Sequence, residues 1–309
     1  MTNFSYEVFS EVARQKTFIA AAKQLQVTPS AISHSINSLE KDLGFSLFVR
    51  SRSGVRLTPN GQRVLPLIQD ILNAEATLNE EAALINGLNK GRVRIGAFSS
   101  VCINWLPDII NKFKNIYPDI EVTVWQGNFN DVVEQVKLGI LDIGFSALPI
   151  EENLEVIPLY KDPIYCITPQ DFKLHRGKSI TRDDIKNEKF ILQQIDYDRD
   201  TKRALDTYNV SVNSLQYSID DASIIAMVES GLGLGILPEL ALQNLSGDVN
   251  RYIFSEHFYR TICLVTHQKK QQTPSVKAFV SIIKNYISDR YGLIRDRIKA
   301  HLFPGKRIR

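Results

Sequence analysis

The chain has 309 residues, of which 44% are hydrophobic and 23% are charged. This length favours two or three domains, and this composition is typical of folded globular proteins, so a single small module and a disordered chain are both excluded. The 37 Lys and Arg residues against 34 Asp and Glu residues give a net charge of only +3, so any nucleic-acid-binding surface must be local.

Cysteine usage and hydropathy indicate the compartment. Cys102, Cys166 and Cys263 are far apart and form no CxxC motif, so the sequence predicts neither a disulfide framework nor a thiolate zinc site. No stretch approaches the roughly 18 apolar residues of a membrane span, and the first residues lack the apolar core of a signal peptide. We therefore expect a cytoplasmic protein with no membrane partner.

Residues 1–58 are predicted to form a domain that begins with three short helices. The apolar spacing predicts two helices within the first 25 residues, and Thr28 followed by Pro29 marks the start of a third. The apolar residues of this third helix share one face, and they are Ile32, Ile36 and Leu39. Two short helices joined by a tight turn form a helix-turn-helix unit, whose second helix can enter the major groove of DNA.

The segment 47–58 alternates apolar and polar residues around a Ser-Gly turn and contains no acid, which predicts a two-stranded basic wing. The polar residues of the third helix and the arginines of the wing are therefore the candidate DNA contacts, with a plain solvated surface as the alternative. We expect base or groove-edge contacts from Ser33, His34 and Asn37, phosphate contacts from Ser30, Arg50, Arg52 and Arg56, and further contacts at the helix start from Thr28 and Pro29.

A dense pattern of residues covers this region: Phe9, Ala13, Thr17-Phe18, Ala20-Ala21-Ala22, Leu25, Thr28-Pro29-Ser30-Ala31-Ile32-Ser33, Ile36, Leu39-Glu40, Leu43-Gly44, Leu47-Phe48, Arg50, Leu57-Thr58 and Gly61. In order and spacing this pattern resembles the LysR-type transcriptional regulators. The resemblance implies a winged helix-turn-helix with the helix over 28–39 in the major groove.

Residues 59–90 are predicted to form a linker helix that begins after Thr58. The net charge changes from +4 over residues 1–66 to −3 over residues 67–90, which also indicates a boundary near its start. Apolar residues along the helix repeat at alternating steps of four and three, a coiled-coil seam interrupted by Glu75. The seam consists of Val64, Ile68, Ile71, Leu78, Ala82 and Ile85. Either a partner helix covers it or the helix packs on its own effector domain; the resemblance implies antiparallel pairing of two chains.

From residue 91 onward, short β-branched runs alternate with helical stretches, which predicts βα units and parallel sheets. One unit covers residues 92–146 and a second covers 190–237, so the fold class is α/β with two subdomains and a cleft between them. The resemblance implies that the effector-binding domain, 91–309, is like a periplasmic binding protein, with crossing hinge segments near Lys161–Tyr165 and Cys263–His267. Subdomain I is assigned to about 91–161 and 267–309, and subdomain II to about 162–266.

The ends of the predicted strands indicate where a ligand binds. In open parallel sheets, ligands lie beyond the carboxyl ends of the strands, where helix N-termini present free amides. Hydroxyls and amides at these ends favour a small anionic effector, although a neutral molecule fits the same cleft, and capping of the next helix is the alternative role of the serines. The candidate effector-binding residues are Ser99, Ser100 and Ser146 in subdomain I and Gln193, Gln194 and Asp196 in subdomain II.

The sequence carries no signature of catalysis. The histidines are scattered, no HExxH or GxSxG motif occurs and no carboxylates have metal-ligand spacing, so we expect no enzyme, no metal and no cofactor. Cys166 and Cys263, on the expected hinge strands, suggest a redox sensor as the alternative to buried inert thiols. The stretch 290–309 holds seven basic residues against one acid and is either a DNA-contacting tail or a solvated end.

Together with the resemblance, these features predict a ligand-responsive transcription factor that binds double-stranded promoter DNA as a homo-oligomer, a dimer or a tetramer. The transcription machinery is a further candidate partner. Two alternatives stay open: a small-molecule binding protein whose helix-turn-helix serves only for interaction, and an enzyme with its active site in the cleft. Salt-dependent, site-specific DNA binding separates the first prediction from both.

Overall fold

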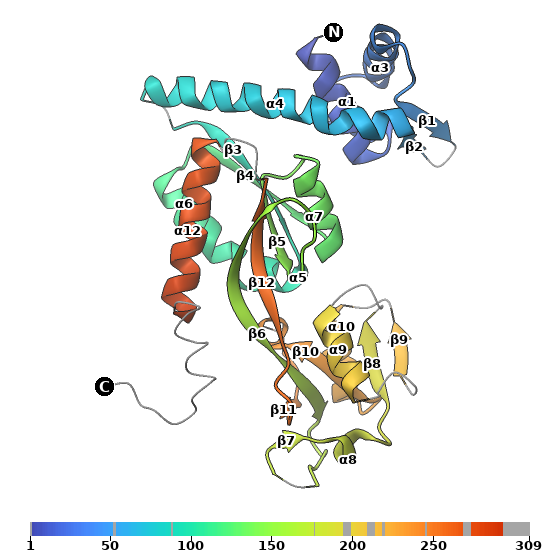
Figure 1. The fold of residues 1–309 in the computed structure, drawn as a ribbon, viewed down its shortest axis with the longest axis vertical. Coiled ribbons are helices and arrows are strands. Elements are labelled where there is room, and N and C mark those ends of the chain that lie inside the picture. The colour runs from blue at the N-terminus through green and yellow to red at the C-terminus, as the bar shows by residue number, and fades with distance from the viewer. Residues whose placement is uncertain are drawn as a thin grey trace.

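The computed structural model describes residues 2–51, 54–87, 89–175, 177–193, 199–208, 214–217, 220–244, 246–267 and 273–292. The chain forms an N-terminal helical domain with a small hairpin, a long helix that crosses above the rest, and two α/β subdomains joined by two long strands (Figure 1). Among the described residues, no helix is both long enough and apolar enough to cross a membrane.

The N-terminal domain is the predicted winged helix-turn-helix. Each helix begins after a threonine whose hydroxyl accepts a backbone N–H of the first turn, and Gly44, with φ 80°, ends the third helix. That helix was predicted to end at about Leu39, but it continues for one more turn to Leu43, where Gly44 stops it. The elements are α1 (Asn3–Gln15), α2 (Phe18–Gln24), α3 (Pro29–Leu43), β1 (Phe48–Ser51) and β2 (Gly54–Leu57).

Helix α4 (Pro59–Ile85) follows β2 directly and is capped by the Thr58 hydroxyl, which accepts the Gly61 N–H. The first turn of α4 lies tightly against the chain that enters β1, since a Cβ on Gly61 would collide with the Leu47 carbonyl oxygen. The N-terminal half of α4 packs on the helix-turn-helix, and its remainder extends across the top of the effector domain (Figure 1).

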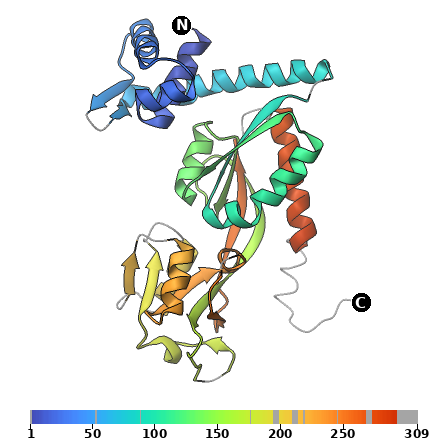
Figure 2. The same cartoon turned by 180° about the vertical axis from the view of Figure 1, so that it is seen from behind.

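Subdomain I is a parallel sheet with an added antiparallel strand, in the order β4, β3, β5, β12. Helices α6 and α12 cover one face and α7 covers the other (Figures 1 and 2). The core between them is aromatic, with Trp105, Phe113, Phe145 and Phe279 fully buried. The elements are β3 (Gly91–Ala97), α5 (Ser99–Asn104), α6 (Leu106–Ile116), β4 (Ile120–Gln126), α7 (Phe129–Lys137), β5 (Ile143–Ala147), β12 (Tyr259–Thr266) and α12 (Pro274–Tyr291).

Subdomain II continues the sheet through β6, β10, β8 and β9, and β11 pairs with both β6 and β7. Two smaller apolar clusters form its core, one around Phe190 and Phe254 and one around Ile167 and Ile224. The elements are β6 (Glu155–Pro169), which both subdomains share, β7 (Ser179–Ile180), α8 (Arg182–Ile185), β8 (Phe190–Gln193), α9 (Arg199–Thr207), β9 (Ser214–Tyr217), α10 (Asp221–Glu229), β10 (Leu234–Pro238), α11 (Glu239–Leu242) and β11 (Val249–Phe254).

The two crossing segments differ in how well they were predicted. Strand β6 pairs with β12 up to Pro163 and with β10 from Ile164 onward, so the first crossing lies within the predicted range. The second was placed at Cys263–His267, which is wrong: residues 262–266 pair with β5 in the sheet of subdomain I. The chain therefore returns to subdomain I at Tyr259, and the expected subdomain boundary at residue 267 moves with it.

Candidate DNA-binding surface and effector cleft

Helix α3 separates its residues into an apolar inner face and a polar outer face. Ile32, Ile36 and Leu39 are completely buried in the helix-turn-helix core, which fixes the orientation of the helix. The outer face therefore presents small hydrogen-bonding side chains to solvent. Among the predicted contacts on and next to α3, Ser33 is half-buried. The others are exposed, and they are Thr28, Pro29, Ser30, His34 and Asn37.

Arg50 of the wing lies against α3. One Nη donates to the Asn37 Oδ1 at 2.7 Å and the other to the Ser33 Oγ at 3.4 Å, while the guanidinium carbon lies 4.7 Å from the centre of the Phe18 ring. The structure therefore brings three predicted DNA-contacting residues, Ser33, Asn37 and Arg50, into one group at the exposed surface. Stacking on Phe18 and two hydrogen bonds hold the arginine in place, so it orders the polar face of α3.

The Glu40 side chain on α3 holds the start of the wing. Glu40 accepts the N–H groups of Leu47 and Phe48 at 2.6 and 3.2 Å, and these bonds set the position where β1 begins. Arg56 on β2 is exposed, and Arg52 lies outside the described residues. Glu40 was not among the predicted site residues; its side chain acts through backbone groups seven and eight residues away, which no helical spacing indicates.

The predicted effector-binding serines divide into one accessible and two internal groups. Ser99, at the start of α5, is half-buried. Ser100 is buried and its Oγ accepts a hydrogen bond from Arg260 at 3.0 Å, and Ser146 is buried and donates to the Phe129 carbonyl oxygen at 3.3 Å. Both hydroxyls serve internal contacts, and a ligand contact from Ser100 or Ser146 stays a prediction.

Three residues of subdomain II were also predicted to bind the effector. Gln193 is the last residue of β8. Gln194 and Asp196 lie outside the described residues. Among the residues that are described, no three His, Cys, Asp or Glu side chains are grouped so that they could hold a metal ion.

A buried ion pair joins the hinge strands beside Ser100. Arg260 on β12 donates from Nε to the Asp162 Oδ2 at 2.8 Å, and the Asp162 Oδ1 accepts the N–H of Leu240 at 2.9 Å. The two side chains are 3% and 0% exposed, and the guanidinium also lies 4.9 Å from the centre of the Phe98 ring. Burial raises the pKa of Asp162 to about 6, even though Arg260 and the Leu240 amide favour the carboxylate and act to lower it.

Helix α5 is also tied to subdomain II. The Asn104 Nδ2 donates to the Leu240 carbonyl oxygen at 2.7 Å, and the Asn104 Oδ1 accepts from the Asn244 side chain at 2.7 Å. Leu240 itself is completely buried in the core of subdomain I. The short helix that begins with Ser99 is thus attached at its far end to α11.

The predicted seam of α4 has a buried part and an exposed part. Ile68 is buried in the helix-turn-helix core and Val64 packs against that core, so the prediction of Ile68 as a partner-facing residue is wrong. Its own domain occupies that side of the helix. Further along α4, the remaining seam residues are exposed to solvent, with Ile85 84% exposed: Ile71, Leu78, Ala82 and Ile85.

The hinge cysteines do not form a pair. Cys166 lies in subdomain II, opposite Ile236 and Tyr252, whereas Cys263 lies in subdomain I, opposite Ser146. Both are completely buried, and burial raises the pKa of Cys263 to about 12 and raises that of Cys166 as well. These observations favour buried inert thiols over a redox sensor, since the two cysteines lie on opposite sides of the crossing and burial disfavours the thiolate.

A winged helix-turn-helix, a long helix and a hinged α/β domain define the class of DNA-binding regulators with a ligand-binding module. Residues 5–62 match the bacterial regulatory helix-turn-helix proteins of the lysR family, and residues 86–288 match the LysR substrate binding domain. The chain belongs to the LysR family of transcriptional regulators.

Relatives and solved structures agree over the full length. The chain is 29% identical to the uncharacterized HTH-type transcriptional regulator YvbU of Bacillus subtilis, over 92% of this chain and 98% of that protein. A full-length OxyR variant from Pseudomonas aeruginosa shares the fold with a TM-score of 0.72 and 22% identity, over 93% of this chain and 97% of that chain. CbnR in complex with its target DNA gives a TM-score of 0.61 and 19% identity, over 93% of this chain and all of that chain (100%).

Proposed function

We propose that the chain binds promoter DNA as a homo-oligomer in the cytoplasm and changes its activity when a small molecule binds between the effector subdomains. The observation that carries the DNA-binding part is the exposed polar face of α3 with Arg50 placed beside Ser33 and Asn37. An arginine held next to an amide and a hydroxyl presents the groups that read base edges and phosphates together. CbnR, which has a similar fold, was solved in complex with its target DNA, and this supports DNA binding by the chain.

The test is a fluorescence-anisotropy titration of the full chain against its own upstream intergenic DNA and a scrambled duplex, at two salt concentrations. We expect preference for the upstream DNA and a Kd that rises with salt. Asn37→Ala should reduce this preference about tenfold, since a lost base contact costs roughly 1–3 kcal/mol. Ser38→Ala, an exposed neighbour on α3, is the matched control. Equal, weak binding to both duplexes would reject the proposal.

The oligomer is proposed to form through the exposed part of the α4 seam. Ile71, Leu78 and Ile85 are large apolar side chains that a second α4 helix would cover. Leu78→Glu should dissociate the oligomer in analytical ultracentrifugation, whereas Asn79→Glu, next to it and also exposed, should not. An unchanged sedimentation coefficient for Leu78→Glu would move the interface elsewhere.

The effector is proposed to be a small anionic molecule that reaches the first turn of α5. Ser99 is half-buried there. The guanidinium of Arg260 donates hydrogen bonds to Asp162 and to the neighbouring Ser100. Small carboxylates and their neutral amides provide the probes, and thermal shift of the full chain is the measurement. We expect a carboxylate, but not its amide, to stabilise the chain, and we expect this stabilisation to disappear in Ser99→Ala. Stabilisation by the amide alone would establish a neutral effector.

A further inference from the structure

The turn between α7 and β5 belongs to the effector domain but completes the core of the DNA-binding domain. Ile140, 9% exposed, lies in the same buried cluster as Leu65 and Ile68 of α4 and Phe9 of α1, and Leu138 packs against that cluster. Three parts of the chain therefore meet at one place: the helix-turn-helix, the linker helix and subdomain I. An apolar contact of this kind excludes water from one side of the meeting point.

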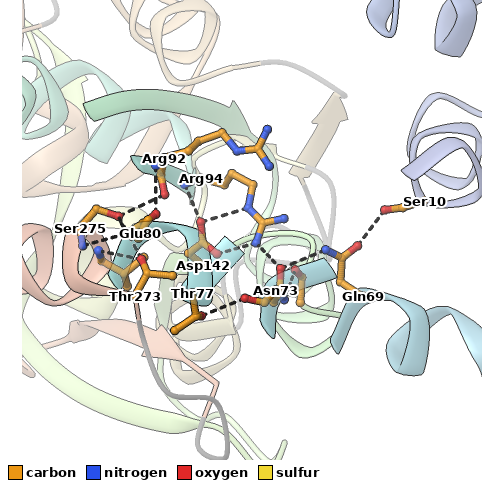
Figure 3. A network of polar contacts seen from close by, with 12 residues as sticks. Ser10, Gln69, Asn73, Thr77, Glu80, Arg92, Arg94, Asp142, Thr273 and Ser275 are labelled. Atoms are coloured by element: carbon orange, nitrogen blue, oxygen red, sulfur yellow. Dashed lines mark hydrogen bonds and ion pairs between the residues drawn. The ribbon is translucent and has the colours of Figure 1, made fainter. Parts of the chain in front are cut away.

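A chain of polar contacts connects β3, α4 and α1 (Figure 3). Arg94 on β3 forms an ion pair with Asp142, with Nη2 at 2.5 Å and Nε at 3.0 Å from the two carboxylate oxygens, and its Nη2 also donates to the Asn73 Oδ1 on α4 at 2.9 Å. The Gln69 amide donates to the same oxygen at 3.2 Å, and its carbonyl accepts the Ser10 hydroxyl of α1 at 2.7 Å. Arg94 is thus two side chains away from the DNA-binding domain.

A second polar contact holds the C-terminal part of α4. The buried Glu80 carboxylate accepts the hydroxyl and N–H of Ser275, at 2.6 and 3.2 Å, and the N–H of Arg92 at 3.2 Å. Ser275 lies in the first turn of α12, whose free amides favour a negative charge. Gly91 leaves the room for this carboxylate, since a Cβ there would lie 2.5 Å from the Glu80 carboxyl carbon.

We propose that these two contacts, which we call the linker dock (Arg94–Asp142–Asn73 and Glu80–Ser275), hold the DNA-binding domain at a fixed orientation on subdomain I and transmit changes of the effector domain to it. The transmission rests on the proposed function, whereas the dock itself does not. Asp142 directly precedes β5, the strand that pairs with hinge strand β12, so rearrangement at the hinge reaches Asp142 through one sheet.

The accessibility of the dock suits a contact that opens and closes. The Arg94 and Asp142 side chains are 16% and 17% exposed, so water can replace their contacts at moderate cost. A docked and an undocked state of α4 would then be two populations that the effector domain biases. Because coupling between sites is reciprocal, DNA bound at the helix-turn-helix must alter the effector domain through the same residues.

Hydrogen exchange of the full chain, followed by mass spectrometry, tests the dock without DNA. In Arg94→Gln we expect about tenfold faster exchange over residues 3–15 and 138–142, because the variant loses the charged hydrogen bonds of Arg94 to Asp142 and Asn73. Arg92→Gln, on the same strand and exposed, is the matched control and should exchange like the wild type. Glu80→Gln should accelerate exchange over 273–279, with the exposed Glu81→Gln as its control. Equal exchange in each variant and its control would overturn the dock.

The same measurement with the upstream duplex bound tests transmission. We expect DNA to change exchange over 98–104 in the wild type, and this change to disappear in Arg94→Gln while its DNA affinity stays within about twofold. A change that persists in Arg94→Gln, or none in the wild type despite DNA binding, would overturn transmission. If no duplex binds any variant, the proposed function fails, and transmission with it, whereas the DNA-free exchange still decides the dock.

Discussion

The hinge between the effector subdomains and the linker dock both connect parts of the chain through polar side chains, but they do so at different depths. At the hinge, Asp162 and Arg260 are essentially inaccessible to solvent and neutralise each other. At the dock, Arg94 and Asp142 keep part of their surface in water, and Glu80 is held by neutral hydroxyl and amide donors. A fully buried pair is costly to open, whereas a partly solvated one can exchange its contacts with water.

This difference assigns separate roles to the two connections. Opening the hinge pair would leave two charges in an apolar surrounding formed by Phe98 and Phe129, which contact the guanidinium. We therefore expect a hinge movement to leave the pair of Asp162 and Arg260 intact. The dock has the weaker contacts and is the element that the motion can release.

The largest effect is expected from Asp162→Ala. Removing the carboxylate takes from the buried Arg260 charge its Asp162 partner and from the Leu240 N–H its acceptor, which should lower the free energy of unfolding by about 3–5 kcal/mol. Urea unfolding of the full chain measures it, and Asp171→Ala, an exposed residue beyond the end of β6, is the control. Asp162→Asn keeps an acceptor and should cost less. A loss below about 1 kcal/mol in the alanine variant would mean that the pair does not hold the hinge.

The second effect depends on pH and concerns the Asp184 carboxylate, which accepts hydrogen bonds from Thr181 and His175. Although burial opposes ionisation, hydrogen bonds from Thr181 and His175 hold the pKa of Asp184 at about 2, below its ordinary value of 3.8. A lowered pKa stabilises the fold above pH 4, and this stabilisation is lost as the pH falls towards 2. Asp184→Asn should therefore cost about 2 kcal/mol at pH 7 and almost nothing at pH 2.

Urea unfolding at several pH values measures this cost. Asp183→Asn in the same short helix is the control, because the Asp183 side chain is 80% exposed. A cost for Asp184→Asn that stays constant between pH 7 and pH 2 would show that the side chain acts through packing and not through its charge.

Gly91→Ala should produce a smaller effect at the dock. The added methyl group displaces the Glu80 carboxylate from Ser275 and Arg92, which should cost about 1–2 kcal/mol and accelerate hydrogen exchange at the start of α12. Lys90→Ala, an exposed neighbour, is the control. Unchanged exchange at α12 in Gly91→Ala would contradict the tight placement of Glu80.

Local signals in the sequence were sufficient for much of the fold. Threonine followed by proline marks the starts of α3 and α4, and apolar spacing then fixes which face of α3 is buried. The same signal, Thr273-Pro274, begins α12, which was not predicted. The apolar residues of α12 recur at helical spacing, so this helix could have been found; they include Val276, Phe279, Val280, Ile283 and Ile287.

The contacts of the hinge and the dock could not be found in the same way. Asp162 and Arg260 are 98 residues apart, and Glu80 and Ser275 are 195 apart, so no periodicity connects them. The error at the second crossing has a related cause. Residues 262–266 form an uninterrupted run of a strand, and only their pairing with β5 shows to which subdomain they belong.

The smallest effect is expected from oxidation, which tests whether the cysteines of the hinge strands act as a redox sensor. Cys166 and Cys263 are buried on opposite sides of the crossing, and burial raises both pKa values, so neither forms a thiolate at neutral pH. Hydrogen peroxide should therefore alter DNA affinity by less than about twofold. Half-buried Cys102, whose pKa burial raises to about 11, should be the first thiol modified in intact-mass spectra. A large peroxide effect that Cys166→Ser and Cys263→Ser abolish together would require the hinge strands to separate in solution.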